Sequence, residues 1–156
     1  MPISAPRTRV LLVDEEVVVR AGLRLLIDGW PSLQVIGEAD TPSEALAYLA
    51  NTKPNLIVCS YSQATGAFLS DLRDVVERAD QIPVVVLTSS RHPQAGTTAL
   101  QAGVKCVISK KHTPVELRQT LEQFGVRGNG SAKTKPANQT TIASSTDSDR
   151  RAKART

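Results

Sequence analysis

Five short apolar runs alternate with amphipathic segments along the first 124 residues, and this alternation limits the possible folds more than any other feature. The runs cover residues 10–13, 33–37, 56–59, 84–87 and 104–108. Three of them are apolar at nearly every position, which is typical of strands buried on both faces of a parallel sheet. The segments between them carry apolar residues at helical spacing. The sequence therefore predicts an α/β fold with the order (βα)₅.

Local signals place several helix boundaries. Thr41-Pro42 and Thr113-Pro114 each put Thr at an N-cap and Pro at the first helical position, and the Glu two residues after each Pro can return a hydrogen bond to the N–H of the cap residue. Gly103 suits the left-handed residue that ends a helix. Right-handed crossovers would wind these units into a doubly wound five-stranded parallel sheet with helices on both faces.

Within the first helix, the predicted apolar face consists of Val19, Gly22, Leu23 and Leu26, spaced at intervals of three and four residues.

The positive charge of the chain lies in its last 32 residues. Residues 125–156 contain seven Lys or Arg and two Asp, a balance of +5, whereas the remaining 12 basic and 13 acidic residues give −1 for residues 1–124. The final segment is rich in Ser, Thr, Asn, Ala and Gly and can bury little apolar surface. We therefore predict an N-terminal extension over 1–7, one domain over 8–124 and a disordered basic tail over 125–156.

No run of 18 apolar residues and no signal-peptide pattern is visible, so the expectation is a cytoplasmic protein without a membrane partner. The two cysteines, Cys59 and Cys106, both lie in apolar strand segments, where a free thiol behaves as a small hydrophobe. Neither suggests a disulfide or a metal site. For Cys59, the apolar neighbours predict a buried, unreactive thiol.

Polar residues follow the strands at the edge where a doubly wound sheet binds its ligands. The candidates are Asp14 and Glu15 after the first strand, Ser60 at the third, Thr88 at the fourth and Lys110 after the fifth. Adjacent acids suit Mg²⁺ and a phosphoryl oxygen, and a hydroxyl and an ammonium suit the remaining phosphoryl oxygens. An alternative interpretation of the two acids is a pair of solvated carboxylates at a helix N-terminus.

Residues 8–124 resemble the receiver domain of two-component response regulators. The similarity rests on Val13-Asp14-Glu15, Leu87-Thr88-Ser89 and Ser109-Lys110, and on the sequences 101–104 and 113–117, which resemble receivers that precede a helix-turn-helix output domain. The resemblance implies a flavodoxin-like sheet with strand order 2-1-3-4-5. It also implies a phosphate pocket made by the acids, Thr88 and Lys110.

Three departures from the family pattern stand out. The resemblance places the phosphate-accepting aspartate at Ser60, and it places a switch aromatic residue, which swings when the Thr moves, at Val107. No helix-turn-helix segment follows the helix that ends near Phe124. The chain is therefore expected to be a degenerate receiver in which the phosphate-accepting residue and the switch residue are both changed.

The change at Ser60 alters the chemistry expected of the pocket. A carboxylate would form a reactive acyl phosphate, whereas an alkyl phosphate on serine lacks that lability, and no base lies near in sequence to ionise the hydroxyl. Loss of the third carboxylate also removes an anionic ligand, so at best weak Mg²⁺ binding by Asp14 and Glu15 is expected, and no other cofactor. Lys110 should then form an ion pair with Asp14.

These observations favour a non-enzymatic protein-interaction module in phosphorelay signalling. The expected partners are a protein, such as a histidine kinase or a DNA-binding regulator, or a second copy of the chain bound at the face of the last two helices and the fifth strand. Weak nucleic-acid contact is expected only of the basic tail. The alternatives are a transcription regulator, or a fragment of one, that works through a DNA-binding partner, and a phosphoacceptor that uses another residue.

Overall fold

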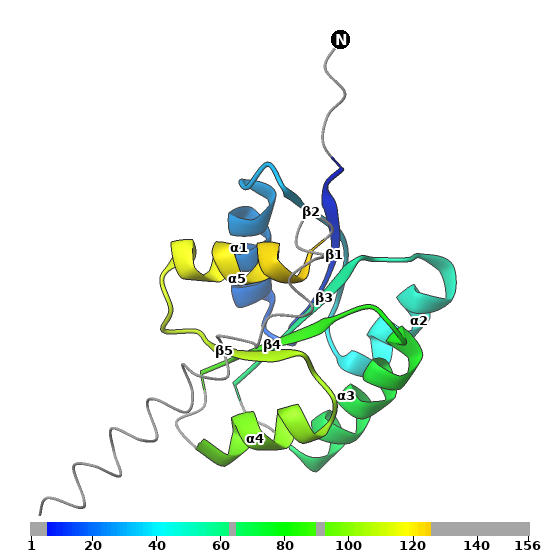
Figure 1. Cartoon of the computed structure of the whole chain (residues 1–156). Helices are drawn as coiled ribbons and strands as arrows, with labels where there is room; N and C mark the ends of the chain where they lie inside the picture. The colour runs from blue at the N-terminus through cyan, green and yellow to red at the C-terminus, as the bar shows by residue number, and fades with distance from the viewer. Residues whose placement is uncertain (1–5, 63–64, 90–92, 126–156) are drawn as a thin grey trace, which may run out of the picture.

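The computed structural model describes residues 6–62, 65–89 and 93–125, and within them a five-stranded parallel sheet forms the centre of the molecule (Figure 1). The sheet has the order β2-β1-β3-β4-β5, as predicted. Every strand pair is parallel, because each connection crosses one face of the sheet. The strands are β1 (Thr8–Val13), β2 (Leu33–Ala39), β3 (Leu56–Tyr61), β4 (Val84–Thr88) and β5 (Cys106–Ser109).

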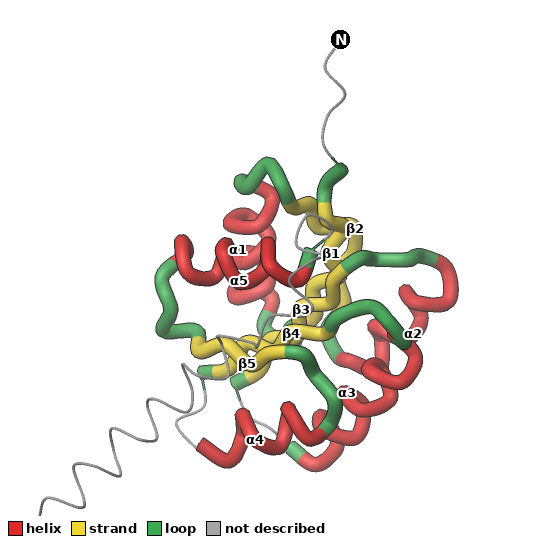
Figure 2. The backbone as a smooth tube through the Cα atoms, in the orientation of Figure 1, coloured by secondary structure: helices red, strands yellow, loops and turns green. Residues whose placement is uncertain are grey.

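Five helices cover the two faces of the sheet, as the tube in Figure 2 shows. One side carries α1 and α5, and the other carries α2, α3 and α4 (Figure 1). The arrangement confirms a doubly wound (βα)₅ fold. The helices are α1 (Val17–Asp28), α2 (Pro42–Asn51), α3 (Gly66–Ala79), α4 (Pro93–Gln101) and α5 (Pro114–Phe124).

Hydroxyl side chains cap three of these helices. Thr113 accepts a hydrogen bond from Glu116 N–H and its own N–H donates to the Glu116 carboxylate, which confirms the predicted reciprocal cap of α5. Thr41 caps α2 in the same way, but the Glu44 carboxylate accepts from the N–H of Asp40, one residue before the cap.

Thr65, which the sequence analysis did not single out, caps α3 by accepting from Phe68 N–H.

The sheet separates two apolar clusters. The cluster under α2, α3 and α4 contains Cys59, Tyr61, Val86 and Val107, and the cluster under α1 and α5 contains Leu12, Val58, Leu87 and Ile108. Residues two apart on one strand share a cluster, as the alternation of side chains across a sheet requires. The cluster membership therefore identifies which face each strand-end residue occupies.

The start of β1 and the end of α5 meet at the amino-terminal edge of the sheet. A Cβ atom built on Gly125 would lie 2.3 Å from Thr8 Oγ1, so backbone and side chain are in close contact there. The predicted extension over 1–7 and the predicted tail over 125–156 lie mostly outside the described residues.

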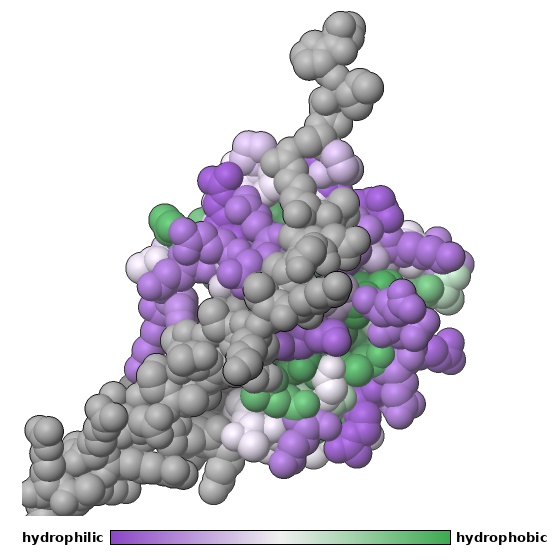
Figure 3. Space-filling view, viewed as in Figure 1, coloured by the Kyte–Doolittle hydropathy of each residue, from purple (hydrophilic) through white to green (hydrophobic). Residues whose placement is uncertain are grey.

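The visible surface of the described residues is largely hydrophilic, with a hydrophobic patch on the side where Figure 1 places α3 and α4 (Figure 3). Among the described helices, none combines the length and apolarity that spanning a membrane requires.

Candidate functional site

The polar residues predicted to form a site lie at the carboxyl edge of the sheet. Ser60 is the last residue but one of β3, Thr88 ends β4, and Asp14 and Lys110 directly follow β1 and β5. Lys110 N–H donates to Thr88 C=O, and Asp14 N–H donates to Ala39 C=O, so both positions continue the sheet by hydrogen bonding. The topology thus gathers the strand ends at one edge, where open α/β sheets bind ligands.

Asp14 is the buried acid of this edge, with 1% of the residue exposed. Its Oδ1 accepts a hydrogen bond of 2.7 Å from Glu16 N–H at the start of α1, which fixes the carboxylate orientation. Its buried Oδ2 has no hydrogen-bond partner among the described residues. Glu15, by contrast, is exposed to solvent. Of the two adjacent acids, only Asp14 therefore points into the protein.

Lys110 supplies the cation that faces Asp14. Its Nζ lies 3.9 Å from Asp14 Oδ2, and its side chain is 20% exposed. The predicted ion pair is present, but this distance exceeds that of an N–H···O hydrogen bond. The pair therefore partly neutralises the buried carboxylate without completing its hydrogen bonding.

Ser60 is 2% exposed, and its Oγ has no hydrogen-bond partner among the described residues. Its neighbour on the same face two residues earlier, Val58, belongs to the cluster under α1 and α5, as does Leu12, two residues before Asp14. Alternation therefore places Ser60 and Asp14 on the same face of the sheet. A buried hydroxyl that lacks a partner is energetically unfavourable, and it marks a position suited to a ligand atom or a larger polar side chain.

Thr88 lies on the opposite face from these residues. Val86, two residues earlier on β4, belongs to the cluster under α2, α3 and α4, and the register pairs Thr88 with Tyr61 of β3. The Thr88 and Tyr61 side chains share a hydrogen bond. The structure therefore brings Asp14, Ser60 and Lys110 together on one face and directs Thr88 toward Tyr61 on the other.

Tyr61 is the residue of this region that the sequence analysis missed, because the third strand was predicted to end before it. Its ring is buried and packs against Phe68 of α3, with ring centroids 4.6 Å apart. Burial raises the pKa of Tyr61, and the hydrogen bond with Thr88 lowers it by a smaller amount. Val107 of β5 is buried in the same apolar cluster. The aromatic rings of this cluster among the described residues come from Tyr61 of β3, Phe68 of α3 and Tyr48 of α2, and β5 contributes an aliphatic side chain.

These residues fit a divalent cation poorly. Mg²⁺ prefers six oxygen ligands and is commonly held by one or two carboxylates, waters and phosphate oxygens. Here one carboxylate is buried beside an ammonium, the other is exposed, and the third strand end offers a neutral hydroxyl. The part of the chain that the structure describes holds no group of three or more His, Cys, Asp or Glu placed to bind a metal.

Cys59, next to Ser60, points into the cluster under α2, α3 and α4 and is fully buried. Burial raises the pKa of its thiol to about 12. Because the thiolate is the reactive form, this thiol is unreactive at neutral pH. The predicted burial of Cys59 is confirmed, and its raised pKa supports the expected lack of reactivity.

Comparison with known proteins identifies the family to which this chain is similar. Residues 10–122 match the family model of the response regulator receiver domain. The chain is 31% identical over 117 residues to the uncharacterized transcriptional regulatory protein YhcZ of Bacillus subtilis, covering 75% of this chain and 55% of that protein. It is also 31% identical over 117 residues to the DNA-binding transcriptional activator DevR/DosR of Mycobacterium tuberculosis, covering 75% and 54%.

The fold has a counterpart among solved structures. A two-component response regulator of the LuxR family from Aurantimonas sp. SI85-9A1 superposes with a TM-score of 0.67 at 26% identity, covering 74% of this chain and 83% of that one. The chain spans about half the length of the curated relatives that it matches.

Proposed function

Because the chain belongs to the response regulator receiver family, we propose that it is a degenerate receiver that acts through protein contacts and is not phosphorylated on an aspartate. The observation that carries this proposal is Ser60 at the carboxyl end of β3, beside Asp14 and Lys110. The family resemblance assigns the acceptor carboxylate to this position. With serine at this position, the edge keeps the residues that would surround a phosphoryl group but lacks the carboxylate that would be phosphorylated.

Ser60 lacks what an alternative nucleophile needs. A hydroxyl attacks phosphorus when a general base removes its proton, and the buried acid on the same face, Asp14, accepts from Glu16 N–H and faces the Lys110 ammonium. The Ser60 Oγ has no hydrogen bond to any described base. The proposed module therefore has no enzymatic activity of its own.

Thr88 and Val107 support the proposal that the pocket is not structurally coupled to the distal face of the domain. The resemblance implies that a receiver couples its pocket to that face by moving the Thr and an aromatic ring. In this chain the Thr88 side chain is engaged by Tyr61, and Val107 has no ring to move. We propose that the Thr and the switch position, which move between two conformations in a receiver, are held in one conformation here. Regulation then comes from a partner or from protein abundance.

Mg²⁺ binding by the native chain is proposed to be weak, with Asp14 and Glu15 as its carboxylates. The Lys110 ammonium lies where it competes with a cation for Asp14. Replacing Ser60 with aspartate restores a third carboxylate and should raise the Mg²⁺ affinity at least about tenfold, because an added charged ligand strengthens binding of a hard cation. Isothermal titration of the native chain and of Ser60→Asp measures this difference.

The proposed partner is another protein in the cytoplasm, such as a histidine kinase or a DNA-binding regulator, or a second copy of the chain. A second candidate function is transcription regulation through a DNA-binding partner. It is favoured by the printed names of the two curated relatives, which describe transcriptional regulatory proteins. Pull-down with the tagged chain from its native cell, followed by mass spectrometry, separates the two: recovery of a DNA-binding regulator favours the second, and recovery of a kinase alone favours the first.

Intact-mass spectrometry of the full chain after incubation with Mg²⁺ and acetyl phosphate tests the central proposal. The native chain should show no gain of a phosphoryl group, whereas Ser60→Asp should gain one that is lost at alkaline pH, because acyl phosphates hydrolyse readily. Ser60→Ala serves as the matched control and should behave like the native chain. A stable phosphoryl group on the native chain would overturn the proposal, and its absence from Ser60→Ala would identify Ser60 as the acceptor.

A further inference from the structure

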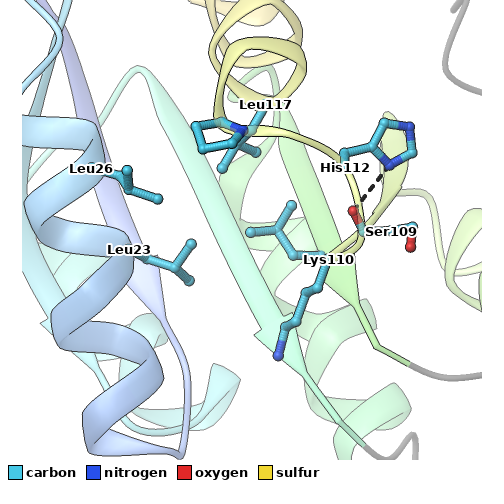
Figure 4. Close-up of a pocket in the computed structure, with 8 residues that line it drawn as sticks. Leu23, Leu26, Ser109, Lys110, His112 and Leu117 are labelled. Atoms are coloured by element: carbon cyan, nitrogen blue, oxygen red, sulfur yellow. Dashed lines mark hydrogen bonds between the residues drawn. The ribbon is translucent and has the colours of Figure 1, made fainter.

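A cavity of about 280 Å³ opens between α1 and α5 on one face of the sheet. Figure 4 shows Leu23 and Leu26 pointing from α1 toward Leu117 of α5, with the Lys110 side chain extending along the gap between them. The residues that line it include Leu23, Leu26, Leu87, Lys110, His112 and Leu117.

The apolar walls of this cavity are incompletely covered by the protein itself. Ile27 is the buried residue of α1, whereas Leu23 is half-buried and Leu26 is 38% exposed. Leu87 of β4 is buried and lines the cavity. Leu117 of α5 faces α1 across the gap. Leucine side chains on three elements therefore face a space that none of them fills, and burying them against an apolar ligand would be favourable.

The polar end of the cavity is cationic. Among the described residues, the Lys110 ammonium donates no hydrogen bond, and its acidic neighbour, Asp14, lies at 3.9 Å. His112 is held by a contact of 3.0 Å between its Nδ1 and Ser109 C=O and does not engage Lys110. The ammonium thus has unused donors and is partly exposed, whereas the Asp14 carboxylate is fully buried. An incoming group meets the cation rather than the acid.

The unpartnered Ser60 hydroxyl lies close to the same place. Ser60 of β3 is the register partner of Leu87 of β4, so their side chains are adjacent on the face of the sheet that carries α1 and α5. The part of the cavity wall that Leu87 forms therefore borders a buried hydroxyl without a hydrogen bond among the described residues. A ligand carboxylate bound to Lys110 would therefore lie on the same side of the cavity as the Ser60 hydroxyl, which is a second hydrogen-bond donor.

We propose that the cavity binds a small apolar carboxylic acid, with its hydrocarbon body between the leucines of α1 and α5 and its carboxylate on the Lys110 ammonium. The charge complementarity selects an anion, because Lys110 is the charged lining residue and its hydrogen-bond donors are free among the described residues. A cavity of roughly 150 Å³ lined by similar side chains takes up benzene, so 280 Å³ suits a body of about six to ten carbons.

Isothermal titration of the full chain with sodium octanoate, below its micellar concentration, tests the proposal. Octanoate should bind at one site and raise the melting temperature, octan-1-ol should bind at least tenfold more weakly, and octylamine should not bind. Equal binding of octanol or octylamine would overturn the assignment of Lys110 as the anion partner. Absence of octanoate binding would overturn the proposal as a whole, and neither result bears on phosphorylation of the chain.

Matched variants locate the site. Leu26→Gln should weaken octanoate binding at least tenfold, whereas Leu25→Gln, on the 78% exposed residue beside it, should not change it. Lys110→Met should abolish the preference for octanoate over octanol, and Lys111→Met, on the exposed neighbouring lysine, should retain it. Equal effects within either pair would contradict the site. The Leu26 pair keeps the test decisive even if Lys110→Met is unstable, because Leu26 is partly exposed and tolerates a polar side chain.

Discussion

Tyr61 and Thr88 are register partners on neighbouring strands, and their side chains share a hydrogen bond on the face of the sheet opposite the Asp14–Lys110 ion pair. The threonine that the family resemblance assigns to a phosphate pocket is therefore engaged by the core of the protein. Any group that draws Thr88 toward the pocket must first break this bond and leave a buried phenol without its partner.

Removing the phenol should measure what this contact contributes. Tyr61→Phe keeps the ring against Phe68 and deletes only the hydroxyl, so we expect the free energy of unfolding to fall by about 1 kcal/mol. Tyr48→Phe is the control, because Tyr48 is half-buried on α2, and it should change stability by less than about 0.5 kcal/mol. Urea denaturation followed by circular dichroism gives both values. Similar losses in the two variants would show that the Tyr61 hydroxyl contributes nothing specific.

The ion pair between Asp14 and Lys110 should appear as a coupling in a double-mutant cycle. Lys110→Met leaves a buried carboxylate without its cation, and we expect a loss of about 2 kcal/mol. Asp14→Asn keeps the acceptor for Glu16 N–H and removes the charge. When both changes are combined, the loss should be smaller than the sum by about 1 kcal/mol, measured by urea denaturation at pH 7. Additive losses would mean that the two charges do not interact.

The buried Cys59 thiol should make the fold less stable at high pH. Burial raises its pKa from the usual 9.0 of a thiol to about 12, so between these values the unfolded state loses a proton that the folded state keeps. Stability that is fully present below pH 9 is therefore lost as the pH rises toward 12. From pH 7.5 to 10.5 we expect the native chain to lose about 2 kcal/mol more than Cys59→Val, as measured by urea denaturation. Parallel losses in the two proteins would contradict a shifted thiol.

Two glycines should respond oppositely to alanine. Gly22 lies inside α1 with open space where a Cβ would stand, so Gly22→Ala should stabilise the protein by about 0.5–1 kcal/mol. Gly103 has φ +102, and a Cβ there would lie 2.9 Å from Val76 Cγ1. Gly103→Ala should therefore destabilise by about 1–3 kcal/mol. Thermal melts of both variants give the signs, and a shift in the same direction for both would show that one of these backbone environments is wrongly described.

The fold was predictable because its signals are local. The strands follow from apolar runs, and the Thr113 cap and the left-handed Gly103 follow from residue types with narrow conformational preferences. The partner of the Glu44 carboxylate was not predicted correctly, because the carboxylate accepts from Asp40 N–H, one residue before the expected N–H of the cap residue Thr41.

The inner face of α1 was predicted only in part, because Leu23 packs against the core as expected and Val19 is half-buried. The expected face included Gly22 and Leu26, which are exposed, and it omitted Ile27, which is buried. Apolar residues cover a wide arc of this helix opposite the polar stripe of Arg20, Arg24 and Asp28, so spacing alone does not select the centre of the buried face. The open cavity beside Leu26 is revealed only by the packing of α1.

Sequence reasoning identified the strand ends that approach one another but not the face on which each side chain lies. Asp14 and Lys110 were expected to pair, and they do. The separation of Thr88 from Ser60 and the role of Tyr61 could not be predicted, because both depend on the cross-strand register of β3 and β4, which the sequence does not encode locally.

The contact between Thr8 and Gly125 has a practical consequence. Both flanking segments attach to the domain at a single corner, about 20 Å along β1 from the edge that carries Asp14 and Lys110. A fluorescent label or an affinity handle joined directly before residue 8 or directly after residue 125 is therefore tethered at this remote corner. The same proximity means that a short peptide joining residues 8 and 125 would close the backbone into a ring, and new chain ends could then be opened elsewhere in the sequence.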